Sequence, residues 1–596
     1  MNITSLAEYR LQIETEVNQI QQILKSRGIK NKNTARQIQE VFRPDELTTS
    51  DGVYIPYLFC HLDLKEIDEE ALQNGADADG LYRTASFLIY TARRHNEAGH
   101  TRIRLEDLKT ATRRAEKRLA DTEAITTERI EEALFFITKK IRTAVVEDDY
   151  FQFVTLKNAE ENITNDINEI LKNTIENKIT EEDLVSDIEL DESQKEACLA
   201  INYPISIITG GPGTGKSTIL KTICDTWERY NGGKIVLMAP TGKASQRMRE
   251  ATGRDAQTIH RTLEIQPYKT AIQSPIQDNS LLIIDECSMV DTYLFAILTE
   301  QMLKAKSTIL IGDMEQLQSV GPGAVFRDLL ECKRIKTFEL KTVHRQNENS
   351  MIYKNAQNVV HTKKAIGFYE DEDFTYDMDC ITDNCLVRIR DLYMKESATG
   401  QDVRIFVPIR DEKYKTGTAQ INMMMHYALK EANEAEYLSA HRKAEDGTVY
   451  PTRVYSRGDP VIWTRNDYDL NFLNGDMGVV LEATEEELTV RINGETVTLN
   501  NKRQISECLD LAYATSVHKA QGSTCDIAIV FLPADSENYV EKSLLYVAIT
   551  RPRNCCHLIA EGESVQKAIF KMTDRETGLR DKLKRKEEEI WKVSTN

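Results

Sequence analysis

The stretch ISIITGGPGTGKSTILKTICDTW, residues 205–227, decides the fold of this chain. Its first residues are mostly β-branched, as in a buried parallel strand, and its last residues have helical spacing. Between them, GGPGTGKS follows the G-x-x-x-x-G-K-[ST] pattern of a phosphate-binding loop. Glycines allow successive backbone N–H groups to face phosphate oxygens. The strand, loop and helix together predict an α/β domain that binds a nucleoside triphosphate.

The side chains of this loop have separate expected roles. Lys216 supplies a cation to the β- and γ-phosphates, and the Ser217 hydroxyl supplies a ligand to Mg²⁺. We therefore predict ATP and Mg²⁺ as cofactors. The residues predicted to bind the nucleotide are Gly211, Pro212, Gly213, Thr214, Gly215, Lys216, Ser217 and Thr218.

Two acidic residues, Asp285 and Glu286, follow the apolar run LLII further along the chain. A carboxylate at the end of a strand can reach the magnesium shell, which makes Asp285 a predicted metal ligand beside Ser217. The next carboxylate can orient and deprotonate the attacking water. The pair turns a nucleotide-binding loop into a predicted ATP hydrolase.

Composition limits the class of protein. The 596 residues predict three to five folding units. The net charge of −19, from 76 basic and 95 acidic residues, argues against a protein that coats nucleic acid non-specifically. No stretch approaches the ~20 apolar residues of a membrane span. The cysteines are scattered, which favours reduced thiols in the cytoplasm over a zinc site.

The pattern of apolar residues changes along the chain. Residues 1–180 have helical periodicity and predict a helix bundle, within which the basic stretch 91–104 is either a solvated helix end or a nucleic-acid contact. Strand-like runs follow from 205 to 313, and again at 403–409, 526–532 and 556–561. Short alternating runs between 455 and 505, separated by Asn-Gly turns, predict a small antiparallel barrel or meander.

Basic residues at three places have two possible roles each. Arg345 and Arg551 are either arginine fingers, which accelerate hydrolysis by ~10³–10⁵, or surface ion-pair partners. Residues 234–261 carry six Lys or Arg against two acids. This run is either a track for a phosphate backbone or an exposed charged helix.

Taken in order, these segments resemble the motifs of superfamily 1B helicases, most closely the RecD-like branch. Leu190–Gln194 resembles the adenine-reading motif of that family, and the phosphate loop resembles its first motif. The later motifs have counterparts in APTGKASQRM (239–248), TIHRTL (258–263), IIDECSMVD (283–291), IGDMEQLQSVGPGAVFRDL (311–329), VHRQ (343–346), YATSVHKAQGST (513–524) and LLYVAITRPR (544–553).

The resemblance implies further site residues. Gln194 would read adenine, Gln316 would link the γ-phosphate to the DNA path, and Arg345 and Arg551 would be the arginine fingers. Tyr268 would be a strand-separating wedge. The other DNA contacts implied by the family are Pro240, Thr241, Lys243, Thr258, His260, Arg261, Thr515, His518, Lys519 and Gln521.

Two positions depart from the family pattern. Gln318 stands where relatives often have proline, and we expect little consequence. Pro552 follows Arg551 and restricts the backbone of Arg551 to extended geometry, which affects how the arginine side chain can move.

The resemblance also implies the domain organisation. We expect an α/β protein with two RecA-like P-loop domains, an inserted SH3-like small β-barrel and an N-terminal all-α domain. The expected ranges are 1–185 for the helical domain and acidic linker, 186–344 for domain 1A with a short pin at 263–279, 345–454 and 506–574 for domain 2A, 455–505 for the barrel, and 575–596 for a charged, frayed C-terminal helix.

The predicted function is a DNA helicase that moves 5′→3′ on single-stranded DNA and acts in repair or recombination, with the polarity taken from the family. One alternative is a translocase or a motor subunit of a larger complex, with little unwinding of its own. Another is a binding module that ATP switches. We expect a cytoplasmic monomer that binds single-stranded DNA and duplex junctions, with a protein partner at the N-terminal domain.

Overall fold

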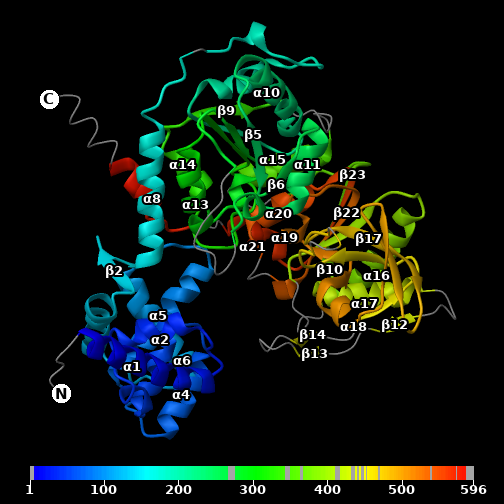
Figure 1. The fold of residues 1–596 in the computed structure, drawn as a ribbon. Coiled ribbons are helices and arrows are strands. Elements are labelled where there is room, and N and C mark those ends of the chain that lie inside the picture. Colours follow the sequence, from blue (N-terminus) through cyan, green and yellow to red (C-terminus); the bar gives the residue numbers. More distant parts are fainter. Residues whose placement is uncertain are drawn as a thin grey trace.

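The chain forms an N-terminal helical region, a long connecting helix and two parallel-sheet domains that lie side by side (Figure 1). The computed structural model describes residues 6–176, 178–265, 275–342, 350–362, 367–409, 416–430, 436–438, 442–443, 449–450, 453–467, 470, 472–536, 540–571 and 574–585.

The first parallel sheet has the order β6-β5-β7-β8-β4-β9. Its strands are β4 (Ile205–Gly210), β5 (Ile235–Ala239), β6 (Ala256–Thr258), β7 (Leu281–Ile284), β8 (Ser307–Gly312) and β9 (Lys336–Leu340). Every pairing is parallel, so the carboxyl ends of all six strands meet at one edge. The helices of this domain are α9 (Glu192–Cys198), α10 (Lys216–Tyr230), α11 (Gly242–Thr252), α12 (Ile259–Thr262), α13 (Thr292–Met302) and α14 (Val325–Glu331).

The second parallel sheet has the order β10-β23-β22-β11-β21. Its strands are β10 (Phe374–Cys380), β11 (Val403–Val407), β21 (Ala514–Ser516), β22 (Cys525–Leu532) and β23 (Pro552–Glu561). The three predicted strands fall on β11, β22 and β23. The proline at 552 opens β23, a position where a missing N–H costs little. Its helices are α15 (Met351–His361), α16 (Thr382–Ser397), α17 (Thr418–Leu429), α19 (Val517–Ala520), α20 (Lys542–Ile549) and α21 (Ser564–Phe570).

An antiparallel sheet is inserted between β11 and β21, with the order β19-β18-β17-β16-β20. It comprises β16 (Pro460–Trp463), β17 (Met477–Ala483), β18 (Leu488–Ile492), β19 (Glu495–Leu499) and β20 (Leu509–Leu511), and α18 (Lys502–Cys508) precedes β20. Asn493 and Gly494 both have positive φ, 52° and 85°, as a two-residue hairpin turn requires. The sheet extends beyond the expected range of 455–505, because β20 pairs with β16.

Two short pairs accompany this sheet. β12 (Glu436–Leu438) pairs with β15 (Val454–Ser456), and β13 (Arg442–Lys443) pairs with β14 (Val449–Tyr450), both antiparallel.

The N-terminal region is mostly helical, but the prediction of an all-α domain is wrong. β1 (Ile103–Arg104), β2 (Ala144–Glu147) and β3 (Tyr150–Phe153) form a three-stranded antiparallel sheet. Asp148 and Asp149 make the β2–β3 turn with φ of 50° and 67°, a conformation that aspartate tolerates better than most residues. The helices are α1 (Leu6–Ser26), α2 (Lys32–Gln39), α3 (Ile55–Phe59), α4 (Leu64–Gln73), α5 (Leu81–Glu97), α6 (Leu105–Ala120) and α7 (Thr127–Phe135).

Arginines of the basic stretch 91–104 make internal contacts. Arg93 donates to the carbonyls of Tyr57 and Cys60, at 3.1 and 2.9 Å. Arg102 pairs with Glu576 and Asp581 near the other end of the chain. Arg93 therefore stabilises the N-terminal region and Arg102 joins it to the C-terminal segment, whereas Arg94 and Arg104 of the same stretch are exposed.

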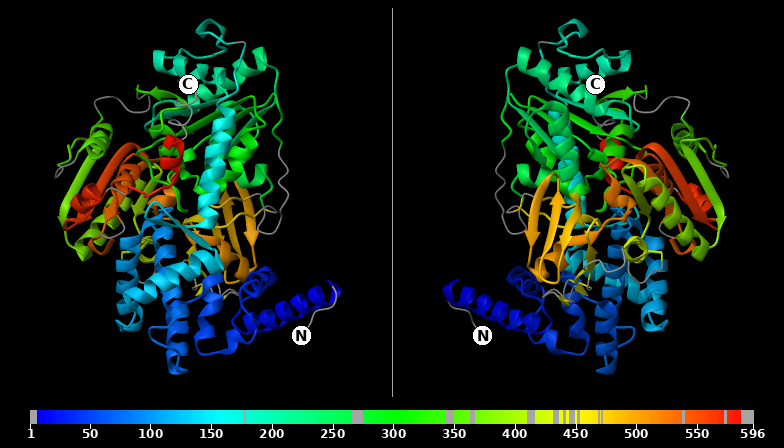
Figure 2. Two further views of the ribbon diagram at one scale, coloured as in Figure 1. Left: turned by 90° about the vertical axis from the view of Figure 1, so that its left-hand side faces the viewer. Right: turned by 90° about the vertical axis from the view of Figure 1, so that its right-hand side faces the viewer.

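Helix α8 (Val154–Ile170) joins the two halves of the molecule. It packs against α13, and its Ile163 and Ile167 share a buried core with Phe295. Figure 2 shows α8 alongside the first parallel-sheet domain, with the C-terminal segment beside it. Leu579 and Leu583 of that segment are buried in the same core, so its described part is anchored and does not fray. Among the described residues, no helix has the length and apolar character to cross a bilayer.

We predict that a buried ion cluster stabilises the N-terminal helices. Arg83 of α5 is fully buried and pairs with Asp68 and Glu116, each at 2.8 Å. Replacing Arg83 with alanine would leave two carboxylates buried without their cation, which costs about 3–5 kcal/mol. Hydrogen exchange of the α4–α6 amides should accelerate strongly.

The matched control is Arg94→Ala on the same helix, because Arg94 is 61% exposed and pairs with Glu97 at the surface. Exposed pairs contribute about 0–1 kcal/mol, so exchange should barely change. Equal acceleration in both variants would contradict the prediction.

Candidate functional site

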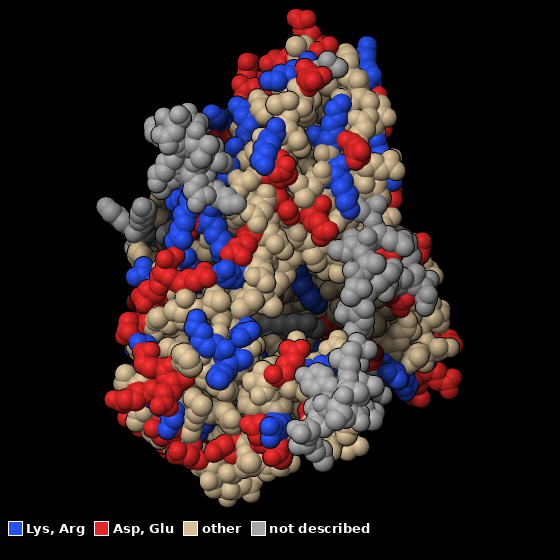
Figure 3. Space-filling view, turned by 60° about the vertical axis from the view of Figure 1, so that its left-hand side comes forward, with Lys and Arg blue, Asp and Glu red and all other residues tan. Residues whose placement is uncertain are grey.

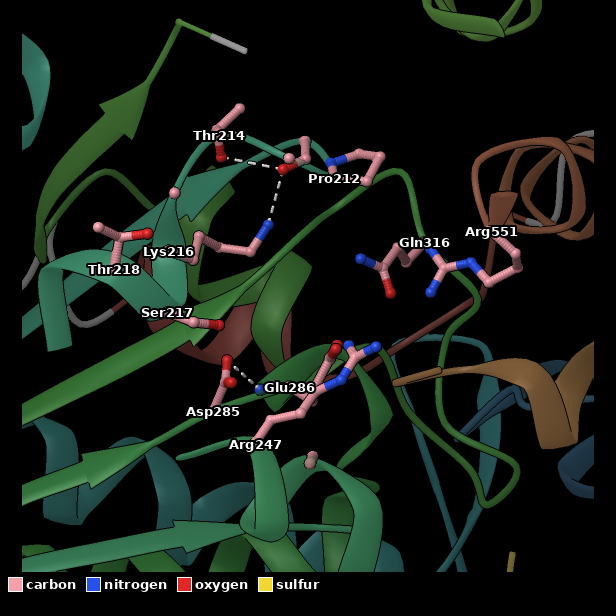
Figure 4. Close-up of a pocket in the computed structure, with 14 residues that line it drawn as sticks. Pro212, Thr214, Lys216, Ser217, Thr218, Arg247, Asp285, Glu286, Gln316 and Arg551 are labelled. Atoms are coloured by element: carbon pink, nitrogen blue, oxygen red, sulfur yellow. Dashed lines mark hydrogen bonds between the residues drawn. The ribbon is translucent and has the colours of Figure 1, made fainter. Parts of the chain in front are cut away.

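A cavity of about 270 Å³ lies at the carboxyl edge of the first sheet, where the second domain meets it. Strand ends of this kind are where open parallel sheets bind ligands. Figure 4 shows the side chains that surround it. The cavity is lined by Gly211, Pro212, Gly213, Thr214, Gly215, Lys216, Ser217, Thr218, Ala244, Arg247, Asp285, Glu286, Gln316 and Arg551.

The phosphate loop joins β4 to α10 and forms one wall of the cavity. Gly213 and Gly215 have φ of 82° and 85°, in the left-handed region that favours glycine. Lys216 Nζ donates to the carbonyls of Gly210 and Gly211. Figure 4 draws the second of these bonds. Because Lys216 also begins α10, the free N–H groups and positive dipole end of that helix face the cavity. These groups suit an anion such as a polyphosphate.

The acidic pair follows β7 on the opposite wall. Asp285 Oδ1 accepts a hydrogen bond from the Glu286 N–H at 2.8 Å. Burial, and then the neighbouring Glu286, raise the pKa of Asp285, while Lys216 and Arg247 oppose the rise. Glu286 has a φ of 53°, a strained conformation for a residue with a side chain. With the backbone in this conformation, the Asp285 and Glu286 carboxylates both line the cavity.

Gln316 and Arg551 reach the cavity from the two domains. Gln316 follows β8, and its Nε2 donates to Asp313 at 3.2 Å. Its Oε1 is buried and has no hydrogen-bond partner among the described residues. Arg551 follows α20 and is 3% exposed, with Nε donating to the Val547 carbonyl at 2.9 Å. Burial lowers the pKa of Arg551, and the nearby Glu286 counters that effect.

Arg247 of α11 also lines the cavity. The sequence analysis counted it in the basic run 234–261, which was either a track for a phosphate backbone or an exposed charged helix. Its Nη2 donates to Thr524 of the second domain at 3.4 Å. Burial, and then Arg551, lower its pKa, whereas Glu286 and Asp285 raise it. Arg247 reaches the cavity because α11 begins where β5 ends, and β5 pairs with the β7 strand that precedes Asp285.

Tyr546 of α20 is a second residue that the sequence analysis did not single out. A Cβ added to Gly211 would lie 3.4 Å from the Tyr546 hydroxyl, so the second domain closely approaches the phosphate loop. Burial, followed by Asp313 and Glu315, raises the pKa of Tyr546.

Gln194, the predicted adenine reader, does not line the cavity. It forms a capping box at the start of α9, in which Asp191 Oδ1 accepts from the Gln194 N–H at 2.9 Å. Its Oε1 accepts from the Asp191 N–H at 3.2 Å.

The predicted DNA contacts of the first domain lie at the ends of β5 and β6. Pro240, Thr241 and Lys243 surround the start of α11, where Thr241 caps the helix. Thr258 caps α12, and His260 and Arg261 on that helix are exposed. Burial, followed by the nearby Arg404 and Arg247, lowers the pKa of Lys243 to about 8.

The predicted contacts of the second domain cluster between β21 and β22. Thr515 is buried in β21, and His518 and Lys519 lie on α19. Gln521 Nε2 donates to the Leu317 carbonyl at 3.2 Å, which joins the second domain to the loop that carries Gln316.

Two predicted residues, Arg345 and Tyr268, lie outside the described residues. Figure 3 shows basic and acidic side chains interspersed over one face, with a hollow near its centre. Among the described residues, the basic side chains of this face do not form a continuous stripe of the kind that would mark a DNA path.

Segments of both parallel-sheet domains match known proteins. The family model described as "AAA domain" matches residues 189–379, and that described as "UvrD-like helicase C-terminal domain" matches residues 511–559. The RecBCD enzyme subunit RecD of Mycobacterium tuberculosis is 28% identical over 437 residues, 66% of this chain and 73% of that protein. The ATP-dependent RecD2 DNA helicase of Deinococcus radiodurans is 32% identical over 356 residues, 59% of this chain and 46% of that protein.

The chain is similar to RecD-like helicases of superfamily 1 over both parallel-sheet domains. Among solved structures, Pif1 helicase from Candida albicans aligns with a TM-score of 0.42 and 17% identity over 64% of this chain and 97% of that one. Bacteroides Pif1 bound to ssDNA aligns with a TM-score of 0.40 and 20% identity over 69% and 99%.

We predict that Arg247 of this RecD-like protein acts on nucleotide. Arg247→Ala should lower kcat for ATP hydrolysis on the order of 100-fold, as expected when a donor to developing charge is removed. DNA affinity without nucleotide should stay within about 2-fold, measured by fluorescence anisotropy, because such binding depends on phosphate contacts made elsewhere.

The control is Arg249→Ala on the same helix, whose guanidinium donates to the Ala256 carbonyl away from the cavity. A loss of DNA affinity in Arg247→Ala with normal kcat would instead support the backbone-track interpretation.

We also predict a pH effect from Lys243. A lysine with a pKa of about 8 is charged below that pH and loses its charge as the pH rises through it. Phosphate binding should favour the charged form of Lys243. DNA affinity should therefore be highest well below the pKa of about 8, and it should fall by up to about 10-fold between pH 7.5 and 9.5.

Lys243→Arg keeps its charge across this range and should remove that fall, measured at constant ionic strength. An identical pH profile in wild type and variant would contradict the role of Lys243.

Proposed function

We propose that the protein is an ATP-dependent DNA helicase that translocates on single-stranded DNA and unwinds duplex. One observation carries the proposal: groups for ATP hydrolysis from the first domain share a cavity with Arg551 of the second domain. A nucleotide bound there would pull the two domains together, and its hydrolysis would release them. The similarity to the RecD2 helicase supports DNA as the substrate.

The residues of the cavity fit a triphosphate with Mg²⁺. Lys216 Nζ is held only by loop carbonyls, and Gln316 Oε1 is an unpartnered buried acceptor within the described chain. Ser217 and Asp285 are the oxygen ligands that would hold Mg²⁺, which supplies charge neutralisation on the phosphates. Glu286 would accept the proton of the attacking water.

The remaining side chains have proposed roles in the coupling. Arg247 and Arg551 would bind the γ-phosphate, and Gln316 would report its loss to Leu317. Because the Leu317 carbonyl accepts from Gln521, a change at the γ-phosphate would reach the α19 segment. That segment and the starts of α11 and α12 are the proposed path of the DNA backbone.

Finer assignments are part of the proposal. We infer that both parallel sheets are RecA-like and that the inserted antiparallel sheet is an SH3-like barrel. The domain boundaries would follow the ranges given by the sequence analysis, except that the inserted sheet continues to β20. We also infer 5′→3′ polarity, a role in repair or recombination, and a cytoplasmic monomer. A protein partner would bind the N-terminal domain.

The test uses duplexes with a single 5′ or 3′ tail. We expect ATP hydrolysis that single-stranded DNA stimulates, and unwinding of the 5′-tailed duplex only. Glu286→Gln should lower both activities by at least about 100-fold, the contribution of a general base. Lys216→Ala should abolish both.

The outcomes separate the rival functions. Stimulated ATPase without unwinding would indicate a translocase or a motor subunit. Function retained in Glu286→Gln but lost in Lys216→Ala would indicate an ATP-switched binding module. Unwinding confined to 3′ tails would overturn the polarity.

A further inference from the structure

The C-terminal segment 574–585 lies at the junction of the N-terminal region, α8 and the first parallel-sheet domain. Figures 1 and 2 both show it next to α8. Leu579 and Leu583 are buried together with Ile163 of α8 and Leu329 of α14. Arg580 pairs with the buried Asp328 of α14 at 3.3 Å. The segment thus has its own anchors in the first domain.

One side chain of this segment, Arg575, holds the loop that follows Gln316. Its Nη1 donates to the Gly323 carbonyl at 2.6 Å, the Gly321 carbonyl at 3.1 Å and the Ser319 hydroxyl at 3.0 Å. Its Nη2 donates to the Ser319 carbonyl at 2.6 Å. The fixed fork of a guanidinium suits several acceptors in one plane, which a lysine cannot match. We call residues 319–323 the sensor loop.

The N-terminal region meets the same loop. The Gly323 N–H donates to the Gly99 carbonyl at 2.8 Å. Gly99 has a φ of 94°, and a Cβ there would lie 2.2 Å from Arg575 Nε. Any larger residue at this position would therefore displace the Arg575 guanidinium from its present place.

The residues beside Arg575 also bind the N-terminal region. The Glu576 N–H donates to His100 Nδ1 at 2.9 Å, and its carbonyl accepts from the Thr101 N–H at 2.9 Å. Burial and the stacked His95 lower the pKa of His100 to about 4, so Nδ1 remains an acceptor at neutral pH.

A buried carboxylate anchors this junction independently of Arg575. Glu160 of α8 accepts from Thr101 Oγ1 at 2.6 Å, the Gly578 N–H at 3.0 Å and Lys582 Nζ at 2.6 Å. Because these contacts do not involve the guanidinium, the segment should stay docked when Arg575 is replaced. Arg575 can therefore be tested apart from folding.

The sensor loop directly follows a segment that contacts both the nucleotide cavity and the second domain. Gln316 lines the nucleotide cavity, and the next carbonyl, that of Leu317, accepts from Gln521 of the second domain. Two residues later, Arg575 holds the loop to the N-terminal region. We propose that Arg575 is a positioning residue for ATP hydrolysis, which fixes the sensor loop so that Gln316 faces the γ-phosphate and so that the N-terminal region influences turnover. This proposal rests on the proposed ATPase function.

The first experiment compares Arg575→Ala, Arg575→Lys and the control Arg585→Ala in the full chain. Arg585 is on the same segment, is 64% exposed and pairs with Asp148 at 2.6 Å. We expect kcat for DNA-stimulated ATP hydrolysis to fall about 10-fold in Arg575→Ala, within the range of coupling through a packed network. KM for ATP should change less than about 2-fold, because binding by the phosphate loop is intact.

Two further results define the role. Arg575→Lys should recover part of kcat, because an ammonium reaches fewer of the acceptors. The control should match wild type. Unchanged kcat in Arg575→Ala, or a loss fully explained by a smaller folded fraction, would overturn the proposal.

Gly99→Ala approaches the same contact from the N-terminal region. Its added Cβ would displace the guanidinium, so kcat should fall in the single variant and fall no further in the double variant with Arg575→Ala. Additive losses would show that the two residues act separately and would refute the coupling.

Hydrogen exchange of the amides at 317–323 gives a readout that does not need turnover. Exchange should accelerate in Arg575→Ala and stay normal in Arg585→Ala, with nucleotide or without it. If wild type lacks DNA-stimulated ATPase, the proposed function fails while this measurement still decides whether Arg575 holds the loop. Unchanged exchange would overturn that hold.

Discussion

The site depends on one geometric constraint, which is that parallel strands bring their carboxyl ends to the same edge of a sheet. In the first sheet β8 lies between β4 and β7, so three separate segments emerge beside one another. These are the phosphate loop, the acidic pair and the loop with Gln316. Each carries polar groups that could not be buried in the middle of a sheet without partners. The edge gives them a cavity. The second domain closes it with Arg551, and Tyr546 of the same domain approaches Gly211 of the phosphate loop.

The charges at this edge explain why the cavity suits a polyphosphate. Three cationic side chains, Lys216, Arg247 and Arg551, face two carboxylates, Asp285 and Glu286. Burial lowers the pKa of both arginines, and Arg551 lowers that of Arg247 further, so the cluster is costly until an anion arrives. A triphosphate would supply that anion at the point where the two domains meet. Binding energy would then be released by closing the domains, which is what a motor requires.

The sequence predicted the parts of the fold and of the site that depend on local stretches of the chain. The phosphate loop, Asp285 and the Asn493–Gly494 hairpin depend on a few consecutive residues whose chemistry has few other uses. Arg247 reaches the cavity, and Tyr546 reaches the phosphate loop, because helices pack in a particular way. Periodicity does not reveal which neighbour a helix face will meet. The N-terminal sheet was missed because helical periodicity surrounds AVVEDDYFQF, although its own alternation was visible. Gln194 instead caps the start of α9 together with Asp191, a role that the local sequence fits as well as it fits adenine binding.

The charged C-terminal segment shows the same limit from the other direction. Its composition suggested a frayed helix, yet Leu579 and Leu583 are four residues apart and so share one face of a helix. Burying that face brings Arg575 to a loop whose carbonyls need donors, since buried backbone acceptors are rarely left unpaired. The sensor loop cannot satisfy those carbonyls within a strand or helix of its own. A side chain from the far end of the sequence, Arg575, does so instead. The N-terminal region thus contacts the loop at Gly323, and the second domain contacts Leu317 just before the loop.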